Sequence, residues 1–215
     1  MKIRNLIEDW PKSYIKDEDL ASFFKKSDDA RYSFVKRALK AGELIRIRRG
    51  LYLIKSKIKL SLPDEFELAL IIYGPSFVSF ESALSYHGWI PESVYTITCA
   101  SAKRAKEFKT PVGVFSYKRV PEENFYMGVE RIETQESVIF IAQPWRALAD
   151  FIYTRKKNWK NLEQLENDLR IDKKTLIESD KEFLKLLTEK YPSHKVRQIL
   201  KKFLKEIVKI SQEKL

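Results

Sequence analysis

Residues 44–54 have the sequence Leu-Ile-Arg-Ile-Arg-Arg-Gly-Leu-Tyr-Leu-Ile, in which two apolar, β-prone runs flank Arg-Arg-Gly. Leu44–Ile47 and Leu51–Ile54 are expected to form two strands, since aliphatic and β-branched residues favour strands. The glycine between them supplies the positive φ that a tight turn often needs. The pattern therefore predicts a small hairpin with Arg48 and Arg49 at its tip.

Three helices are expected before this hairpin. Apolar spacing and boundary residues place them at about 1–10, 17–25 and 28–41. Pro11 ends the first helix, and Ser27 and Gly42 offer an N-cap and a C-terminal stop for the third. Three helices followed by a hairpin form a winged helix-turn-helix, which we expect over residues 1–60.

The third of these helices divides into two faces when it is projected at about 100° per residue. The packing face is expected to hold Ala30, Phe34, Val35, Ala38, Leu39 and Ala41. The opposite face holds Tyr32, Ser33, Lys36, Arg37 and Lys40. Arg31 projects near the packing arc, either at the end of the polar set or against the second helix. Lys and Arg contact phosphates or guanine edges, and Ser and Tyr bond phosphate oxygens, so this face suits a major groove.

The arginines of the hairpin also fit binding to DNA. Arg46, Arg48 and Arg49 are expected to contact a phosphate backbone or a minor groove. Residues 1–60 are therefore predicted to bind double-stranded DNA. A winged helix that docks another protein is the alternative for the same residues, because basic helix faces are often only solvated.

The net charge of +11 is unevenly distributed along the 215 residues. Residues 1–60 hold 16 Lys and Arg against 8 Asp and Glu, 61–150 hold 8 against 12, and 151–215 hold 17 against 10. A strongly basic balance suggests a polyanionic partner but does not indicate a fold. The cations of residues 151–215, called the tail below, form either a solvated face or a second contact with nucleic acid or an acidic protein.

Residues 61–215 are expected to form a second domain. Two helices at about 66–73 and 80–86 are expected first, then strands at about 94–99, 112–120, 128–133 and 137–142, and then a helix at about 144–153. A basic loop is expected at 101–106, and leucine stripes from Asn161 onward predict helices, the last of which Ser193 caps. The predicted class is α+β: a winged helix-turn-helix, a mixed α/β body and a helical C-terminal region, with a boundary near Lys55–Pro63.

The sequence indicates neither a membrane-spanning protein nor an enzyme. No apolar run approaches the ~18 residues of a membrane span, and the N-terminal residues contain no apolar signal-peptide core, so a cytoplasmic protein is expected. Cys99, His87 and His194 are too few for a common metal set, so we expect no metal, no cofactor and no enzymatic activity. His87 is expected to make a structural hydrogen bond and Cys99 to lie in the core. A Cys–His nucleophile pair, or acids at Glu130, Glu133 and Glu136, are the competing readings.

The segment Gly42–Tyr52 resembles the wing pattern G-x-L-x-R-x-x-R-G-x-Y of AbiEi-type transcriptional regulators. Ser79–Gly88, which ends in the sequence Ser-Ala-Leu-Ser-Tyr-His-Gly, is similar to the S-A-L-x-x-H-G helix of that family. Pro91, a strand to Thr98, the loop Lys103-Arg104, Gly113 and the strand Tyr117–Arg119 then follow in the same order. The resemblance covers about residues 15–150, and the tail matches less well.

The resemblance implies an antitoxin of an abortive-infection toxin–antitoxin pair. Such a protein represses its own operon through the winged helix and counters a nucleotidyltransferase-type toxin encoded alongside. A stable complex with the toxin is not implied, and no catalytic residue is carried over. Two alternatives from other classes stay open: a module whose basic tail binds an acidic protein, and an enzyme acting on nucleic acid.

Overall fold

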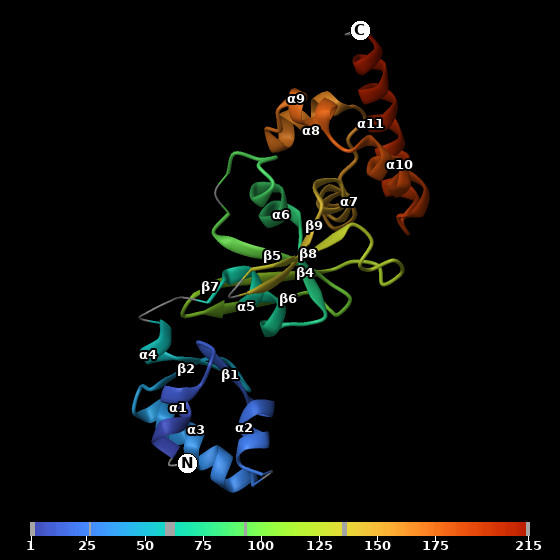
Figure 1. The fold of residues 1–215 in the computed structure, drawn as a ribbon. Helices are drawn as coiled ribbons and strands as arrows, with labels where there is room; N and C mark the ends of the chain where they lie inside the picture. The colour runs from blue at the N-terminus through green and yellow to red at the C-terminus, as the bar shows by residue number, and fades with distance from the viewer. Residues whose placement is uncertain (1–2, 26, 59–62, 93, 135–136, 214–215) are drawn as a thin grey trace. The chain divides into compact units, whose positions relative to one another are not determined.

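The computed structural model of the protein describes residues 3–25, 27–58, 63–92, 94–134 and 137–213. These residues form helices and two β-sheets, one of three strands and one of six (Figure 1). The predicted α+β class is confirmed. The chain divides into two compact units, Met1–Leu68 with Thr110–Val112, and Ala69–Lys109 with Gly113–Leu215. Of the expected boundary segment, residues 59–62 lie outside the described residues.

The first unit begins with three helices and a three-stranded sheet. In chain order its elements are α1 (Ile3–Asp9), β1 (Tyr14–Lys16), α2 (Asp17–Phe23), α3 (Asp28–Lys40), β2 (Leu44–Arg48), β3 (Leu51–Ile54) and α4 (Lys55–Ile58). The sheet is antiparallel with the order β1-β3-β2. The sequence did not predict β1. It also placed the end of the second helix at Lys25, whose positive φ of 49° stops the helix sooner.

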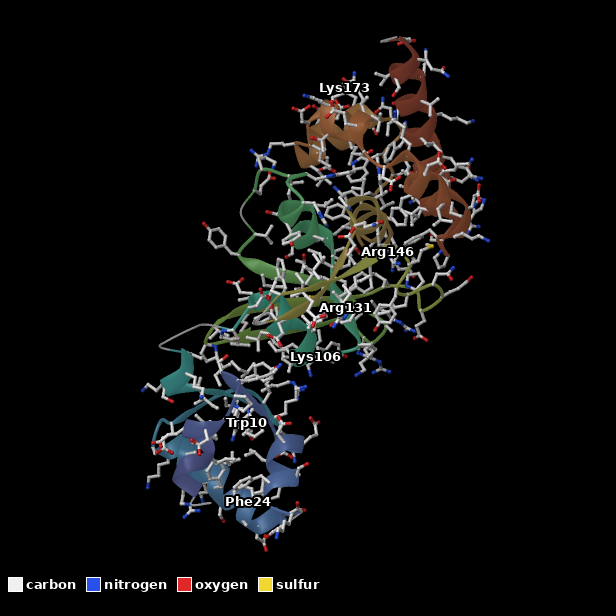
Figure 2. The ribbon with its side chains drawn as sticks, viewed as in Figure 1. Trp10, Phe24, Lys106, Arg131, Arg146 and Lys173 are labelled. Atoms are coloured by element: carbon white, nitrogen blue, oxygen red, sulfur yellow. The ribbon has the colours of Figure 1, made fainter. Side chains whose placement is uncertain are left out.

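The helices of this unit pack on the inner face of its hairpin. The buried apolar side chains are Leu6, Ile7, Ile15, Leu20, Phe34, Val35, Ala38, Leu44, Tyr52 and Ile54. Trp10 and Phe24 pack against this core and are partly exposed (Figure 2). The indole of Trp10 donates a hydrogen bond of 2.9 Å to the Tyr14 carbonyl, which fixes the entry to β1.

The second unit is built on the six-stranded sheet, ordered β6-β7-β5-β4-β9-β8. Its elements up to the tail are β4 (Ser76–Val78), α6 (Phe80–Tyr86), β5 (Thr96–Ser101), β6 (Lys106–Thr110), β7 (Gly113–Arg119), β8 (Val129–Glu133), β9 (Val138–Ala142) and α7 (Pro144–Arg155). The helix α5 (Glu65–Ile72) spans the division between the units. The expected basic loop at 101–106 was too long, because Ser101 still belongs to β5 and Lys106 already begins β6. The strand β6 lies at the edge of the sheet, where charged residues such as lysine are common. These lysines interrupt the alternation of apolar and polar residues by which a strand is predicted from the sequence.

The two faces of this sheet differ. Figure 1 shows α6 and α7 on one face. On the other, the Tyr117 hydroxyl donates a hydrogen bond of 2.6 Å to the Ala69 carbonyl of α5. Because side chains alternate along a strand, Ser116 and Lys118 of β7 point to the face that carries α6.

Four helices form the tail: α8 (Leu162–Leu169), α9 (Lys173–Glu178), α10 (Lys181–Lys190) and α11 (His194–Glu213). Side chains of Asn161, Asp172 and Asp180 accept backbone N–H groups at the starts of α8, α9 and α10. The apolar stripe predicted for α11 is buried at Val196, Ile199, Leu200, Phe203 and Ile207. The prediction was wrong for Val208, which is exposed, and Leu204 is half-buried. No helix within the described ranges is long and apolar enough to span a bilayer.

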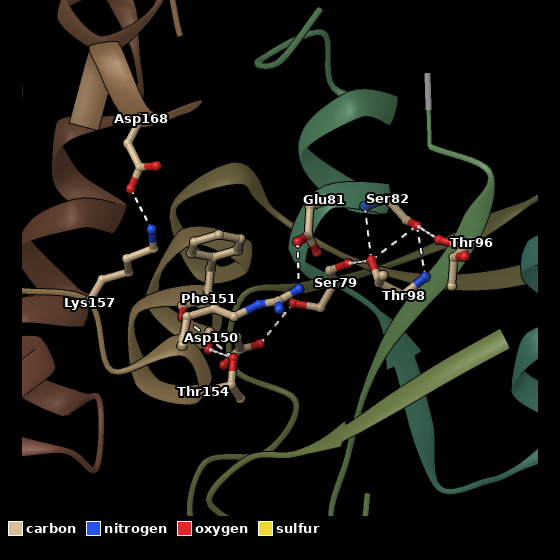
Figure 3. Close-up of polar contacts among 11 residues, drawn as sticks. Ser79, Glu81, Ser82, Thr96, Thr98, Asp150, Phe151, Thr154, Lys157 and Asp168 are labelled. Atoms are coloured by element: carbon tan, nitrogen blue, oxygen red, sulfur yellow. Dashed lines mark hydrogen bonds and ion pairs between the residues drawn. The ribbon is translucent and has the colours of Figure 1, made fainter. Parts of the chain in front are cut away.

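A buried ion pair in α7 connects the sheet to the tail. The Nε of Arg146 lies 3.0 Å from Oδ1 of Asp150, and the two side chains are 2% and 0% exposed. Asp150 also accepts a hydrogen bond of 3.0 Å from the Ser79 hydroxyl (Figure 3). The Tyr191 hydroxyl donates another, of 2.9 Å, to the same carboxylate. Burial raises the pKa of Asp150, and Arg146 opposes that rise. The interaction joins α7 to the start of α6 and to the end of α10.

Candidate nucleic-acid interface

The helix α3 buries one face and exposes the opposite one. Phe34, Val35 and Ala38 are buried. The five side chains expected on the polar face are all exposed: Tyr32, Ser33, Lys36, Arg37 and Lys40. The prediction was wrong for Ala30 and Ala41, which are exposed. They lie at the two ends of the helix, beyond its buried apolar residues.

Arg31 does not belong to the exposed set. Its guanidinium lies 3.3 Å from Asp17 at the start of α2 and 2.9 Å from Asp28 at the start of α3. It also lies over the Tyr32 ring, 5.0 Å from the ring centroid. The Tyr32 hydroxyl and then the two carboxylates raise the pKa of Arg31. Of the two positions left open by the projection, the one against α2 is therefore correct.

The cations of the exposed face are available for a ligand. The Nε of Arg37 donates a hydrogen bond of 3.2 Å to the Ser33 carbonyl, which orients the guanidinium along the helix. No ion pair joins Lys36, Arg37 or Lys40 to any residue in the described part of the chain. Arg37 and Lys40 lie in the last turn, where positive charge also favours the helix.

The hairpin departs from the prediction at its tip. The β2–β3 register shifts between Arg46 and Arg48, so that Arg48 pairs with Leu51 and belongs to the strand. Arg48 is half-buried and donates a hydrogen bond of 2.8 Å to the Arg49 carbonyl, whereas Arg46 and Arg49 are exposed. The extra residue of a bulge explains the shift, which a simple alternation does not predict.

Asp17 connects this turn to α3. Its backbone N–H donates a hydrogen bond of 2.9 Å to the Gly50 carbonyl, while its carboxylate pairs with Arg31. Gly50 has a φ of 78°, and a Cβ there would lie 3.4 Å from the Asp17 Cβ. The sequence did not single out Asp17, because an acid in a first helical turn is already explained by the helix dipole. Its two contacts fix the hairpin turn relative to the first turn of α3.

The residues considered for catalysis have structural contacts. His87 ends α6, and its Nε2 lies 3.0 Å from the Ala142 carbonyl, which confirms the expected structural hydrogen bond. Glu130 accepts a hydrogen bond from Gln143, and Glu133 pairs with Arg131. Glu136 lies outside the described residues. Within the described part of the chain, no group of three or more His, Cys, Asp or Glu side chains is placed to hold a metal ion.

Cys99 lies in the core, as expected, and is fully buried in β5. Burial raises the pKa of its thiol, so the group stays protonated at neutral pH. We expect native protein to react with dithionitrobenzoate far more slowly than protein unfolded in urea. Rapid stoichiometric reaction of the native thiol would contradict this assignment.

Comparison with known proteins does not assign a role to this interface, so its geometry carries the argument. No protein-family model and no curated protein matches the sequence. What the interface offers is a helix face with three cations and two hydroxyls, and a hairpin with two exposed arginines.

Proposed function

We propose that the first unit is a winged helix-turn-helix that binds double-stranded DNA. The exposed polar face of α3, opposite a buried apolar face, is the observation that carries the proposal. The element order α1-β1-α2-α3-β2-β3 and the three-stranded sheet support it. In this arrangement α3 is the recognition helix and the β2–β3 hairpin is the wing.

Each part of the interface has a separate role. Lys36, Arg37 and Lys40 contact phosphates or guanine edges in the major groove. Tyr32 and Ser33 donate hydrogen bonds to phosphate oxygens, which sets the register of the helix on the duplex. Contacts with the DNA backbone or the minor groove come from the hairpin residues Arg46, Arg48 and Arg49. One N–H group of Arg48 already donates a hydrogen bond to the Arg49 carbonyl within the hairpin.

We further propose that the protein is a transcriptional repressor and antitoxin that binds its own promoter and counters a nucleotidyltransferase-type toxin in the cytoplasm. This role is supported by the resemblance of residues 15–150 to AbiEi-type regulators, and it includes no catalysis. Co-expression with the product of the adjacent gene tests it. Growth inhibition by that product, relieved by the full chain, is the expected result, and unrelieved inhibition would contradict it.

Removing the cations of α3 tests the DNA-binding proposal. The triple variant Lys36→Gln, Arg37→Gln, Lys40→Gln is expected to bind the upstream promoter more than tenfold more weakly, because each base or phosphate contact contributes about 1 kcal/mol or more. The salt dependence of the logarithm of the binding constant falls by about 0.9 per lost phosphate contact. Gel-shift titrations at several salt concentrations measure both quantities.

A matched variant controls for net charge. Lys173→Gln, Lys185→Gln, Lys190→Gln removes the same charge from exposed positions on α9 and α10 and should keep nearly wild-type affinity. Arg46→Ala with Arg49→Ala tests the wing, and we expect several-fold weaker binding with unchanged thermal unfolding. Wild-type affinity of the α3 variant would refute the recognition helix, and wild-type affinity of the arginine variant would refute the wing.

A second function is favoured by α11. Five of its lysines are exposed on the side opposite the buried stripe: Lys195, Lys201, Lys202, Lys205 and Lys209. Such a face suits an acidic partner protein. Pull-down with the adjacent gene product distinguishes the two functions, since a complex that survives high salt in the absence of promoter binding supports this one.

A further inference from the structure

The second unit contains a cavity of about 480 Å³ that the DNA-binding proposal does not use. Its floor is the sheet face that carries α6, with Thr96 and Thr98 of β5 beside Ser116 and Lys118 of β7. Glu81 of α6 lines one wall. Volumes of about 300–1,000 Å³ are typical of sites for small ligands.

Two glutamates of this cavity have hydrogen-bonding capacity left over. Glu81 gives one carboxylate oxygen to Arg155, at 2.8 Å, and Glu92 gives one to Arg170. The Oε2 atom of each is buried and has no hydrogen-bond partner among the residues that the structure describes. A buried acceptor without a donor costs about 1–3 kcal/mol, so native structures supply one from water or a ligand.

The charges of the cavity lining favour a cationic donor beside Glu81 and Glu92. Glu107 of β6 adds a third carboxylate to the lining, against the cations Lys118 and Arg155. Arg155 and Arg170 already neutralise one oxygen of each glutamate, and the second oxygen of each is left to receive a charge-assisted hydrogen bond. Lys118 lies further along the sheet, since it pairs with Ala100, four residues beyond Thr96. At about 3.3 Å per residue, the lysine is displaced by about 13 Å along the strand. Lys118 lines the same cavity, but among the described residues it forms no ion pair with Glu81 or Glu92.

The remaining walls suit an aliphatic chain ending in that cation. Ile90, Val94 and Leu169 supply an apolar surface. The Tyr95 ring is 92% exposed at the rim, although a large aromatic side chain usually finds packing partners. An aromatic face within about 6 Å of a guanidinium or an ammonium group attracts it by about 0.5–1 kcal/mol at an exposed site.

We propose that this cavity binds an alkylguanidinium or alkylammonium group. The cation bonds Glu81 and Glu92, the aliphatic chain lies on the apolar wall, and Tyr95 covers the head group. A free amine and an arginine or lysine side chain of a peptide share this chemistry. The proposal does not depend on DNA binding by the first unit, and its test uses no DNA.

Calorimetric titration of the full chain with butylguanidinium tests the proposal, with butylurea as the neutral compound of the same shape. We expect the cation to bind at least tenfold more tightly, which corresponds to about 1.4 kcal/mol, the order of one charge-assisted hydrogen bond. A capped Gly-Arg-Gly peptide distinguishes the two sources. Tighter binding of the peptide indicates a protein side chain, and tighter binding of butylguanidinium indicates a free small-molecule cation. Equal binding of butylurea, or no heat from any cation at millimolar concentration, overturns the proposal.

Three variants locate the binding site. Glu81→Gln with Glu92→Gln should weaken butylguanidinium binding at least tenfold, because the amide keeps an acceptor for each arginine but removes the charge. Tyr95→Ala should weaken it several-fold and leave folding intact, since the ring is exposed. Glu163→Gln with Glu189→Gln removes two exposed carboxylates from the tail helices and should change nothing. Unchanged binding in both the Glu81→Gln, Glu92→Gln variant and the Tyr95→Ala variant overturns the proposal. If the Glu81→Gln, Glu92→Gln variant does not fold, Tyr95→Ala alone decides.

Discussion

The substitution Asp150→Ala is expected to lower the free energy of unfolding of the second unit by about 3–5 kcal/mol. It leaves the Arg146 guanidinium, only 2% exposed, without its counter-charge. The hydroxyls of Tyr191 and Ser79 lose their acceptor at the same time. Urea unfolding of the full chain, followed by tryptophan fluorescence, measures the change, since three of the four tryptophans, Trp89, Trp145 and Trp159, lie in this unit.

Two variants separate the cause from simple loss of packing. Arg146→Met with Asp150→Leu removes both charges and fills similar volume, so it should cost less than Asp150→Ala alone. Tyr191→Phe removes a single hydrogen bond to the carboxylate and should cost about 1–2 kcal/mol. A loss below about 1 kcal/mol for Asp150→Ala would show that the pair does not hold α7 to the tail.

The elements that the sequence predicted are those with a strong local signal. The spacing of Phe34, Val35 and Ala38 defined α3, and the β-prone runs around Gly50 defined the hairpin. Of the strands that were not predicted, β1 and β4 are three residues long, too short to show a period. Each exists because of a distant partner, as when Tyr14 pairs with Leu53 and Ser76 with Ser101. Such pairing cannot be predicted from local pattern.

In the candidate DNA-binding site, too, some features follow from the local sequence and others depend on contacts between distant residues. Exposure of the polar face of α3 follows from helical projection, so the sequence was sufficient. The role of Asp17 and the bulge before Arg48 depend on contacts across the fold. Arg146 and Asp150 have the i,i+4 spacing of a solvated helix pair, and only the packing around α7 makes them a buried one. The cavity draws on residues from Glu81 to Leu169 that share no motif.

The substitution Gly128→Ala is expected to destabilise the second unit by about 2–5 kcal/mol, through two separate effects. Gly128 has a φ of 68°, where a residue with a Cβ costs about 1–2 kcal/mol. A Cβ there would also lie 2.0 Å from Cζ of Phe183 in α10. Either the Phe183 side chain must rotate out of its packed position or α10 must shift, and overpacking of this kind costs about 1–3 kcal/mol. Urea unfolding monitored by tryptophan fluorescence gives the total.

Gly88→Ala isolates the backbone effect, because Gly88 has a nearly equal φ of 69° and a Cβ there would meet no atom within 4 Å. It should cost only about 1–2 kcal/mol. The double variant Gly128→Ala, Phe183→Ala removes the clash, so its loss should be smaller than the sum of the two single losses by about 1–3 kcal/mol. Additive losses would mean that α10 does not depend on the close approach of Phe183 to Gly128. A coupling of the expected size would show that a single glycine lets the tail pack against the sheet.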